Sequence, residues 1–208
     1  MAANYDNSAW FYDRLSRAIY GKSIINSQVY LLDLIPANAN ILIVGGGTGW
    51  ILEELAKQHH AGLQIDYLDI SANMISKAKD QEVGQNQVRF INQSAEEDFE
   101  GSNYNIILTP FFFDNFKEPT MRSIFNRLHQ KLQYNGLWLY ADFQVAGEHQ
   151  FFQKSLLSIM YTCFRAICNV EANHLPDVIT QFAKDGYKLI HHKTFKKEFI
   201  ISLIYKKA

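Results

Sequence analysis

The sequence predicts an α/β fold with a mostly parallel sheet that ends in an antiparallel hairpin. Short apolar runs rich in β-branched residues alternate with segments whose apolar residues recur at helical spacing, which is typical of strands joined by helices. The first run, 41–44, leads into a glycine loop at 45–49. The last two runs, 187–195 and 199–205, are joined by only three residues. A parallel crossover needs about a dozen, so these two strands must be antiparallel.

Apolar runs, helical spacing of apolar residues and residues that end or cap elements predict the remaining strands and helices. Pro36 and Pro110 each end an element, because proline lacks the N–H group that helices and sheets need. Ser71 is a good N-cap for a short helix, and Asn135 with Gly136 is typical of a helix end. The other strands are expected at 63–70, 87–91, 104–109 and 137–142, and the other helices at 7–34 with a break at Gly21, after 71, at 119–134, at 150–168 and at 177–186.

Composition favours a single globular domain that handles small molecules. The chain has 208 residues, 48% of them hydrophobic, and its 20 basic and 21 acidic residues give a formal charge of −1. No global charge attracts nucleic acid or an anionic membrane. The N-terminus has no basic region followed by an apolar run, and the longest stretch without a charged residue, 34–52, is interrupted by Pro36 and the glycine loop. We therefore expect a cytoplasmic protein without integral membrane contact, and buried thiols at Cys163 and Cys168.

The spacing of the glycines indicates which nucleotide the loop would bind. Glycine lets the backbone take positive φ and approach a ligand closely, while the following helix points free N–H groups at it. A dinucleotide loop reads G-x-G-x-x-G/A, which would need its third glycine at Trp50. The third glycine falls one place earlier here, so the pattern is G-x-G-x-G. The loop consists of Gly45, Gly46, Gly47, Thr48 and Gly49.

Asp69 comes at the carboxyl end of the second expected strand, twenty residues after Gly49. A carboxylate there offers two acceptor oxygens to the paired hydroxyls of a ribose. An aspartate at a strand-to-helix boundary can instead cap the helix, and a glycine turn can be an ordinary connection without a ligand. Both alternatives stay open at this point.

The glycine loop, together with Asp69-Ile70-Ser71 and Met74, resembles the donor-binding motifs of the class I S-adenosylmethionine-dependent methyltransferases. The Tyr12-Asp13 pair before a glycine-interrupted helix is similar to the small-molecule quinone-biosynthesis and phospholipid branch. The resemblance implies S-adenosyl-L-methionine as cofactor. It also implies a three-layer αβα sandwich with a Rossmann-like, seven-stranded sheet.

The resemblance further implies roles for single residues. Besides the loop, Asp69 and Ile70, it places Ser94 and Ala95 at the adenine edge and Tyr12 over the donor. An amphipathic helix that packs on the sheet explains the segment around Tyr12 equally well. One position departs from the family, because an acidic residue often stands where this chain has Ile43.

The acceptor side is expected beyond the fourth strand, where Phe111, Phe112, Phe113 and Asp114 follow Pro110. Ligands bind at the carboxyl ends of such strands, and aromatic rings attract a sulfonium and exclude water. At least one of the three rings should instead pack in the core. The sequence therefore predicts methyl transfer to a small, apolar or aromatic acceptor.

A hydroxyl acceptor would need a general base. The candidates are Asp142 and His149, with Asp114 behind them, although a histidine after a strand is usually a surface residue. No metal site is expected, because the acidic run 96–98 lacks the spacing of a calcium loop.

The single domain divides into an N-terminal cap at 1–36, a donor-binding half at 37–142 and acceptor-side helices with the hairpin at 143–208. The helix at 150–168 is expected to be a lid, a dimer surface or a core helix, so a homodimer is possible. Two other functions remain open. A non-catalytic donor-binding or scaffold protein would share the fold, and a pyridine-nucleotide oxidoreductase would share the ribose carboxylate but lacks its third glycine.

Overall fold

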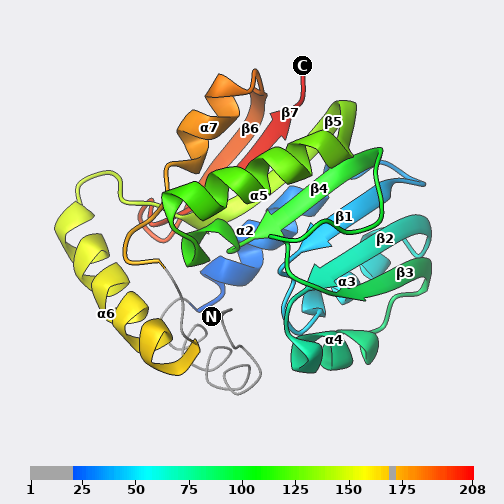
Figure 1. The fold of residues 1–208 in the computed structure, drawn as a ribbon, viewed down its shortest axis with the longest axis horizontal. Helices are drawn as coiled ribbons and strands as arrows, with labels where there is room; N and C mark the ends of the chain where they lie inside the picture. The colour runs from blue at the N-terminus through cyan, green and yellow to red at the C-terminus, as the bar shows by residue number, and fades with distance from the viewer. Residues whose placement is uncertain (1–20, 169–171) are drawn as a thin grey trace.

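Seven strands form one sheet in the order β3-β2-β1-β4-β5-β7-β6 (Figure 1). The structure is a computed structural model that describes residues 21–168 and 172–208, without the side chains of 163–168. The region around Tyr12 and the thiols of Cys163 and Cys168 therefore lie outside what is described. The strands are β1 Asn40–Val44, β2 Ala61–Asp69, β3 Gln85–Asn92, β4 Tyr104–Pro110, β5 Leu132–Phe143, β6 Lys188–Phe195 and β7 Ile200–Lys206.

Strands β1 to β5 pair in parallel, whereas β7 runs antiparallel to both β5 and β6. This arrangement confirms the mostly parallel sheet and the terminal hairpin. The sequential strands β1, β2 and β3 extend to one side of β1, and the chain then returns to place β4 on its other side. In open α/β sheets ligands bind at the carboxyl ends of the strands where the order reverses.

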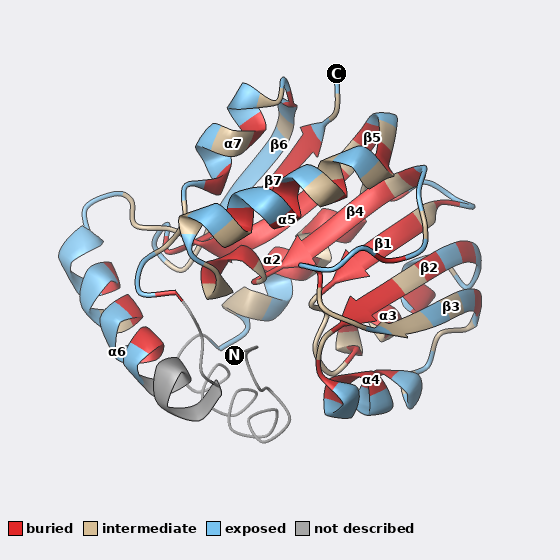
Figure 2. Cartoon of the chain, viewed as in Figure 1, coloured by how far each residue is buried: buried red, intermediate tan, exposed pale blue. Residues whose placement is uncertain are grey.

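Helices cover both faces of the sheet and make three layers (Figure 2). Side chains alternate along each strand, so Ile41 and Ile43 of β1 pack against α2, α3 and α4, and Leu42 and Val44 pack on the face of α5 and α7. The described helices are α2 Ser23–Leu32, α3 Trp50–Gln58, α4 Ala72–Lys79, η1 Phe113–Asn115, α5 Glu118–Lys131, α6 Gln150–Cys168 and α7 Val178–Lys184.

Helix α6 lies beyond the carboxyl ends of the parallel strands (Figure 1). Its inner side packs Leu157 and Met160 into the core, while Phe151 and Phe152 on its outer side are 87% and 67% exposed. The helix is therefore a wall of the edge where ligands bind rather than a fully buried core element. Among the described residues, no helix is long and apolar enough to span a bilayer.

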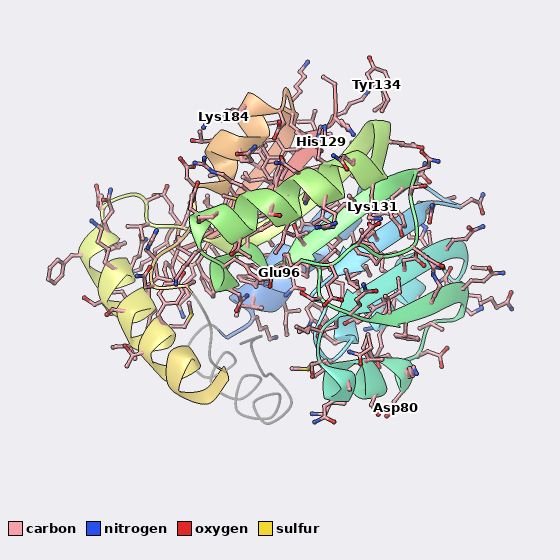
Figure 3. All side chains as sticks on the ribbon, in the orientation of Figure 1. Asp80, Glu96, His129, Lys131, Tyr134 and Lys184 are labelled. Carbon is pink, nitrogen blue, oxygen red and sulfur yellow. The ribbon has the colours of Figure 1, made fainter. Side chains whose placement is uncertain are left out.

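One boundary expected from the sequence is wrong. The helix predicted at 119–134 ends at Lys131, and Leu132 already pairs with Tyr104 as the first residue of β5. Asn135 has a φ of 61°, but it lies within this strand, where the register with β4 shifts, and does not end a helix. Tyr134 is 72% exposed and projects from the edge of the molecule (Figure 3). The helical periodicity gave a wrong end because Leu132 continues the apolar spacing of the helix, although its backbone pairs with Tyr104 of β4.

Gly49 should be among the least replaceable glycines, because its φ is +84° and an added Cβ would lie 2.6 Å from the Cα of Ala78 in α4. Gly186 is the matched control, with a φ of +74° and nothing within 4 Å of its added Cβ. We expect Gly186→Ala to cost about 1–2 kcal/mol for the left-handed backbone alone. Gly49→Ala should cost about 2–5 kcal/mol, since overlap with α4 adds to that strain. Urea unfolding measures both, and equal losses would show that α4 yields without cost.

Candidate functional site

The Asp69 carboxylate connects the glycine loop to the end of β2. Its Oδ2 accepts the backbone N–H of Gly47 at 3.2 Å, and its Oδ1 accepts that of Ser71 at 2.9 Å. The side chain is nearly buried, with 8% exposed. Ser71 itself caps α4 by accepting the N–H of Met74, so Asp69 supports a helix start as well as the loop. A carboxylate at this edge has two acceptor oxygens, the chemistry that suits the paired hydroxyls of a ribose.

Tyr67 of β2 also contacts the glycine loop. The sequence patterns did not select this residue. Its hydroxyl donates to the backbone oxygen of Gly47 at 3.0 Å, and an added Cβ at Gly46 would lie 2.4 Å from that hydroxyl. Burial, with the charge of Asp69, raises the pKa of Tyr67 well above its usual value. Tyr67 is two positions before Asp69, so both point to one face of β2. This two-residue spacing from Asp69 is the sequence signal that could have identified Tyr67 as a contact of the loop.

Two further side chains border the loop. Gln81 donates from Nε2 to the backbone oxygen of Thr48 at 3.2 Å. The ring of Phe112 lies over Gly45, where an added Cβ would approach it to 2.7 Å. At Gly47, by contrast, φ is +65° and an added Cβ would meet no atom of the described residues within 4 Å. The loop is therefore packed at its ends and open at its middle.

The expected adenine-edge residues follow β3, which is the neighbour of β2. Ser94 accepts the N–H of Glu96 at 3.2 Å through Oγ, which forms a local turn, and Ala95 is buried. Asn92, which the sequence analysis did not select, donates from Nδ2 to the backbone oxygen of Ile70 at 2.9 Å. This contact links the ends of β2 and β3 and brings Ile70 and Ser94 to the same edge as Asp69.

The three consecutive phenylalanines have different surroundings. Phe113 is fully buried among Phe125, Trp138 and other rings of the α5–α7 face, so it is a core residue. Phe111 packs on Phe143 on the opposite face, with ring centroids 5.0 Å apart. Phe112 lies between them and is partly buried against the glycine loop. Phe112 is therefore the ring that faces the candidate site.

Asp114 and Asp142 are two buried carboxyl groups at the same sheet edge. Only 4% of Asp114 and 1% of Asp142 is exposed. Burial raises the pKa of Asp142 to about 7, although the N–H of Phe143 donates to its Oδ1 at 2.8 Å and stabilises the charged form. Burial and the neighbouring Asp142 charge raise the pKa of Asp114 well above its usual value. The pair therefore retains a proton near neutral pH.

His149 is exposed in the turn before α6, outside the two cores that enclose the buried acids. The acidic run 96–98 is also exposed, and Asp98 contacts Lys131 at 3.3 Å. Within the described part of the chain, no cluster of three potential metal ligands occurs.

A cavity of about 490 Å³ lies between the end of β5, α6 and the segment that leads into α7. We call it the β5–α6 cavity. Its inner lining is largely aromatic and aliphatic and includes Tyr140, Phe143, Leu157, Tyr161 and Val178. Exposed Lys154, His174 and Asp177 lie at its rim. This volume lies within the usual range for small-molecule sites, about 300–1,000 Å³.

Comparison with known proteins finds one family model that matches the first part of the sheet. Residues 41–136 match a family model described as a methyltransferase domain. The matched segment covers less than half of the chain. It contains the glycine loop, Asp69, Ser94 and the phenylalanine run, and it ends within β5. None of the curated proteins compared with the chain matches it.

Solved methyltransferases share the fold of the whole chain at low sequence identity. The mitomycin 7-O-methyltransferase MmcR is 11% identical with a TM-score of 0.69, and the chain covers 60% of its length while 96% of this chain is aligned. Magnesium protoporphyrin IX methyltransferase from Synechocystis, solved with bound S-adenosylhomocysteine, is 18% identical with a TM-score of 0.66, and the alignment covers 98% of this chain and 96% of that protein. The N-methyltransferase NodS from Bradyrhizobium japonicum, also with S-adenosylhomocysteine, is 12% identical with a TM-score of 0.60, and the alignment covers 88% of this chain and 85% of that protein.

The buried Asp142 carboxyl group predicts a pH-dependent stability. Folding raises the pKa of Asp142 from 3.8 to about 7, so between these pH values the folded state binds more protons than the unfolded state. Stability therefore falls as pH rises through this window. We expect Asp142→Asn to melt increasingly above the wild-type protein as pH rises, because asparagine cannot ionise.

Thermal melts across this pH window test the prediction, and each kcal/mol should shift the midpoint by about 2–4 °C. Asp33→Asn, at an exposed aspartate, is the control and should leave the difference from wild type independent of pH. A constant difference for Asp142→Asn as well would show that Asp142 ionises normally in the folded protein.

Proposed function

We propose that the protein transfers a methyl group from S-adenosyl-L-methionine to a small, largely apolar or aromatic acceptor. The observation that carries the proposal is the hydrogen bond between Gly47 and Asp69, which joins the two motifs of a methyltransferase domain into one site. An isolated glycine turn would not need a buried carboxylate from the next strand. The position expected for the third glycine of a dinucleotide loop is Trp50, the first residue of α3.

The donor is S-adenosylmethionine, and the residues present fit it. Gly47 has positive φ and open space where a side chain would stand, which allows close approach of a ligand. Asp69 presents a carboxylate at this edge, and carboxylate oxygens accept from ribose hydroxyls. The proposed donor contacts are therefore the loop 45–49 with Asp69, Ile70, Ser94 and Ala95, while Ile43 is fully buried and Tyr12 lies outside the described residues.

The donor supplies a methyl group that its sulfonium already activates, so the protein needs to bind, align and desolvate rather than to activate it. Phe112 presents an aromatic ring at the loop, and ring faces attract cations. The packed phenylalanines on either side of it exclude water from this edge of the sheet. These features favour direct transfer to an acceptor on the side of β4 and β5.

The β5–α6 cavity supports the small, apolar acceptor. Its lining joins residues of β5, α6 and the segment before α7, all of which belong to the part of the chain after residue 136. We therefore assign donor binding to residues 37–142 and acceptor binding mainly to 143–208, with Tyr140 of β5 also lining the acceptor cavity. The near-neutral charge of the chain gives no broad basic surface of the kind that nucleic acids need.

Calorimetry should show that S-adenosylmethionine and S-adenosylhomocysteine bind in the micromolar range or tighter, about −8 kcal/mol. Asp69→Ala should weaken both by about 10–100-fold, because it removes the ribose acceptor and the anchor of the loop. Ser71→Ala is the control, since it removes the cap of α4 at a cost of about 1 kcal/mol in stability and keeps the Asp69 carboxylate. Binding of NAD without either donor ligand would overturn the proposal, and equal donor affinity in the two variants would reduce Asp69 to a structural role.

The acceptor class can be tested with labelled donor offered to RNA, to a protein extract and to a fraction of small metabolites. We expect label in the metabolite fraction, and Asp69→Ala should strongly reduce it when the donor concentration is below saturation. Label that appears only in RNA or protein, and that the same variant reduces, would contradict the small acceptor while leaving methyl transfer intact.

A further inference from the structure

Building on the proposed function, we propose that Tyr140 with the Asp142–Asp114 pair accepts the proton of a hydroxyl-bearing aromatic acceptor that binds in the β5–α6 cavity. This inference narrows the acceptor from apolar molecules in general to phenol-like ones. It also assigns a purpose to two buried acids that methyl donation alone does not need.

Tyr140 is the group that connects the cavity to the acids. It lines the cavity and is 5% exposed. It precedes Asp142 by two positions on β5, so both side chains point to the same face of the sheet. Burial is the largest cause that raises the pKa of Tyr140 well above its usual value, and the charge of Asp142 is the next. The two groups therefore interact. A hydroxyl in the cavity would therefore meet the tyrosine first and the acid behind it.

Asp142 can take up a proton from Tyr140. Its Oδ1 accepts the N–H of Phe143. The Tyr140 hydroxyl and the backbone N–H groups of Asp114 and Phe113 also stabilise the charged form of Asp142, while burial opposes it. Asp114 reaches the same place from η1, and two carboxyl groups so close share one proton more easily than none.

The charges around this group come from several elements. Asp142 and Asp114 act on Tyr140 from β5 and η1, and Tyr205 of β7 acts on it as well. At the rim, Lys154 of α6 faces His174 and Asp177 of the opposite segment. The rim therefore carries charges of both signs, whereas the two carboxyl groups lie inside, which suits an acceptor that enters neutral and gives up its proton inward.

The reaction balances without any further reagent. The acceptor oxygen attacks the methyl carbon, the C–S bond breaks with its electron pair remaining on sulfur, and the O–H proton moves to the Tyr140 oxygen as the tyrosine proton moves to Asp142. The products are a methyl ether, S-adenosylhomocysteine and a protonated acid, which later releases its proton to water. Tyr140 is the catalytic residue in this step, and Asp142 and Asp114 are positioning residues that act through it.

Binding of para-nitrophenol to the protein saturated with S-adenosylhomocysteine tests the proposal, because this phenol ionises near neutral pH and its absorbance reports the ionisation. We expect the wild-type protein to bind it and to displace its apparent pKa from the value in water. Tyr140→Phe and Asp142→Asn should bring that pKa back toward the free value while thermal melts show a folded protein. Tyr187→Phe is the matched control, since it removes the hydroxyl of another buried tyrosine outside the cavity lining.

No binding of the probe by the wild-type protein at millimolar concentration would overturn the inference, as would a bound pKa that is the same in wild type, Tyr140→Phe and Tyr187→Phe. Calorimetry with S-adenosylhomocysteine on the same samples separates this failure from failure of the proposed function. A protein that binds that ligand but not the phenol keeps its methyl-transfer function and loses only the phenol-like acceptor.

Discussion

The hydrogen bond from the Gly47 N–H to the Asp69 carboxylate is the constraint on which the candidate donor site depends. It can form only because β1 and β2 are parallel neighbours in a register that pairs Val44 with Leu68, so that both strands end at the same level. Tyr67 adds a second contact from the same strand to the same residue of the loop. One strand thus holds the loop through alternate side chains, and a shift of β2 by one residue would turn both away from it.

The other side of the sheet edge depends on burial rather than on a loop. Asp114 and Asp142 are enclosed between β4, β5 and η1, where an ionised carboxyl group is costly. The aromatic packing around Phe113, Trp138 and Tyr140 makes this environment dry and fixes the strand ends in place. The same rings that stabilise the α5–α7 face therefore also set the protonation of the acids.

The two halves of the site differ in how far they are shared with other proteins. The methyltransferase domain match covers residues 41–136 and so includes every element that surrounds the glycine loop. The β5–α6 cavity begins at Tyr140, beyond that range, and is formed by α6 and the segment before α7. The proposed donor contacts lie in the matched segment and the cavity lies outside it, and solved structures at 11–18% identity share the fold.

The sequence by itself determined the alternation of strands and helices, the terminal hairpin and the Ser71 cap. It also placed the glycine loop and Asp69 at the same sheet edge. These features follow from local periodicity and from parallel strands that end at one edge. It could not place Tyr67 or Gln81, whose contacts cross between elements, and it misplaced the start of β5, where Leu132 satisfies both helical and strand spacing. Which phenylalanine faces the loop, and that Asp142 and Asp114 are buried together, were decided only by tertiary structure. Burial and proximity depend on packing between segments far apart in the chain, and no local pattern encodes them.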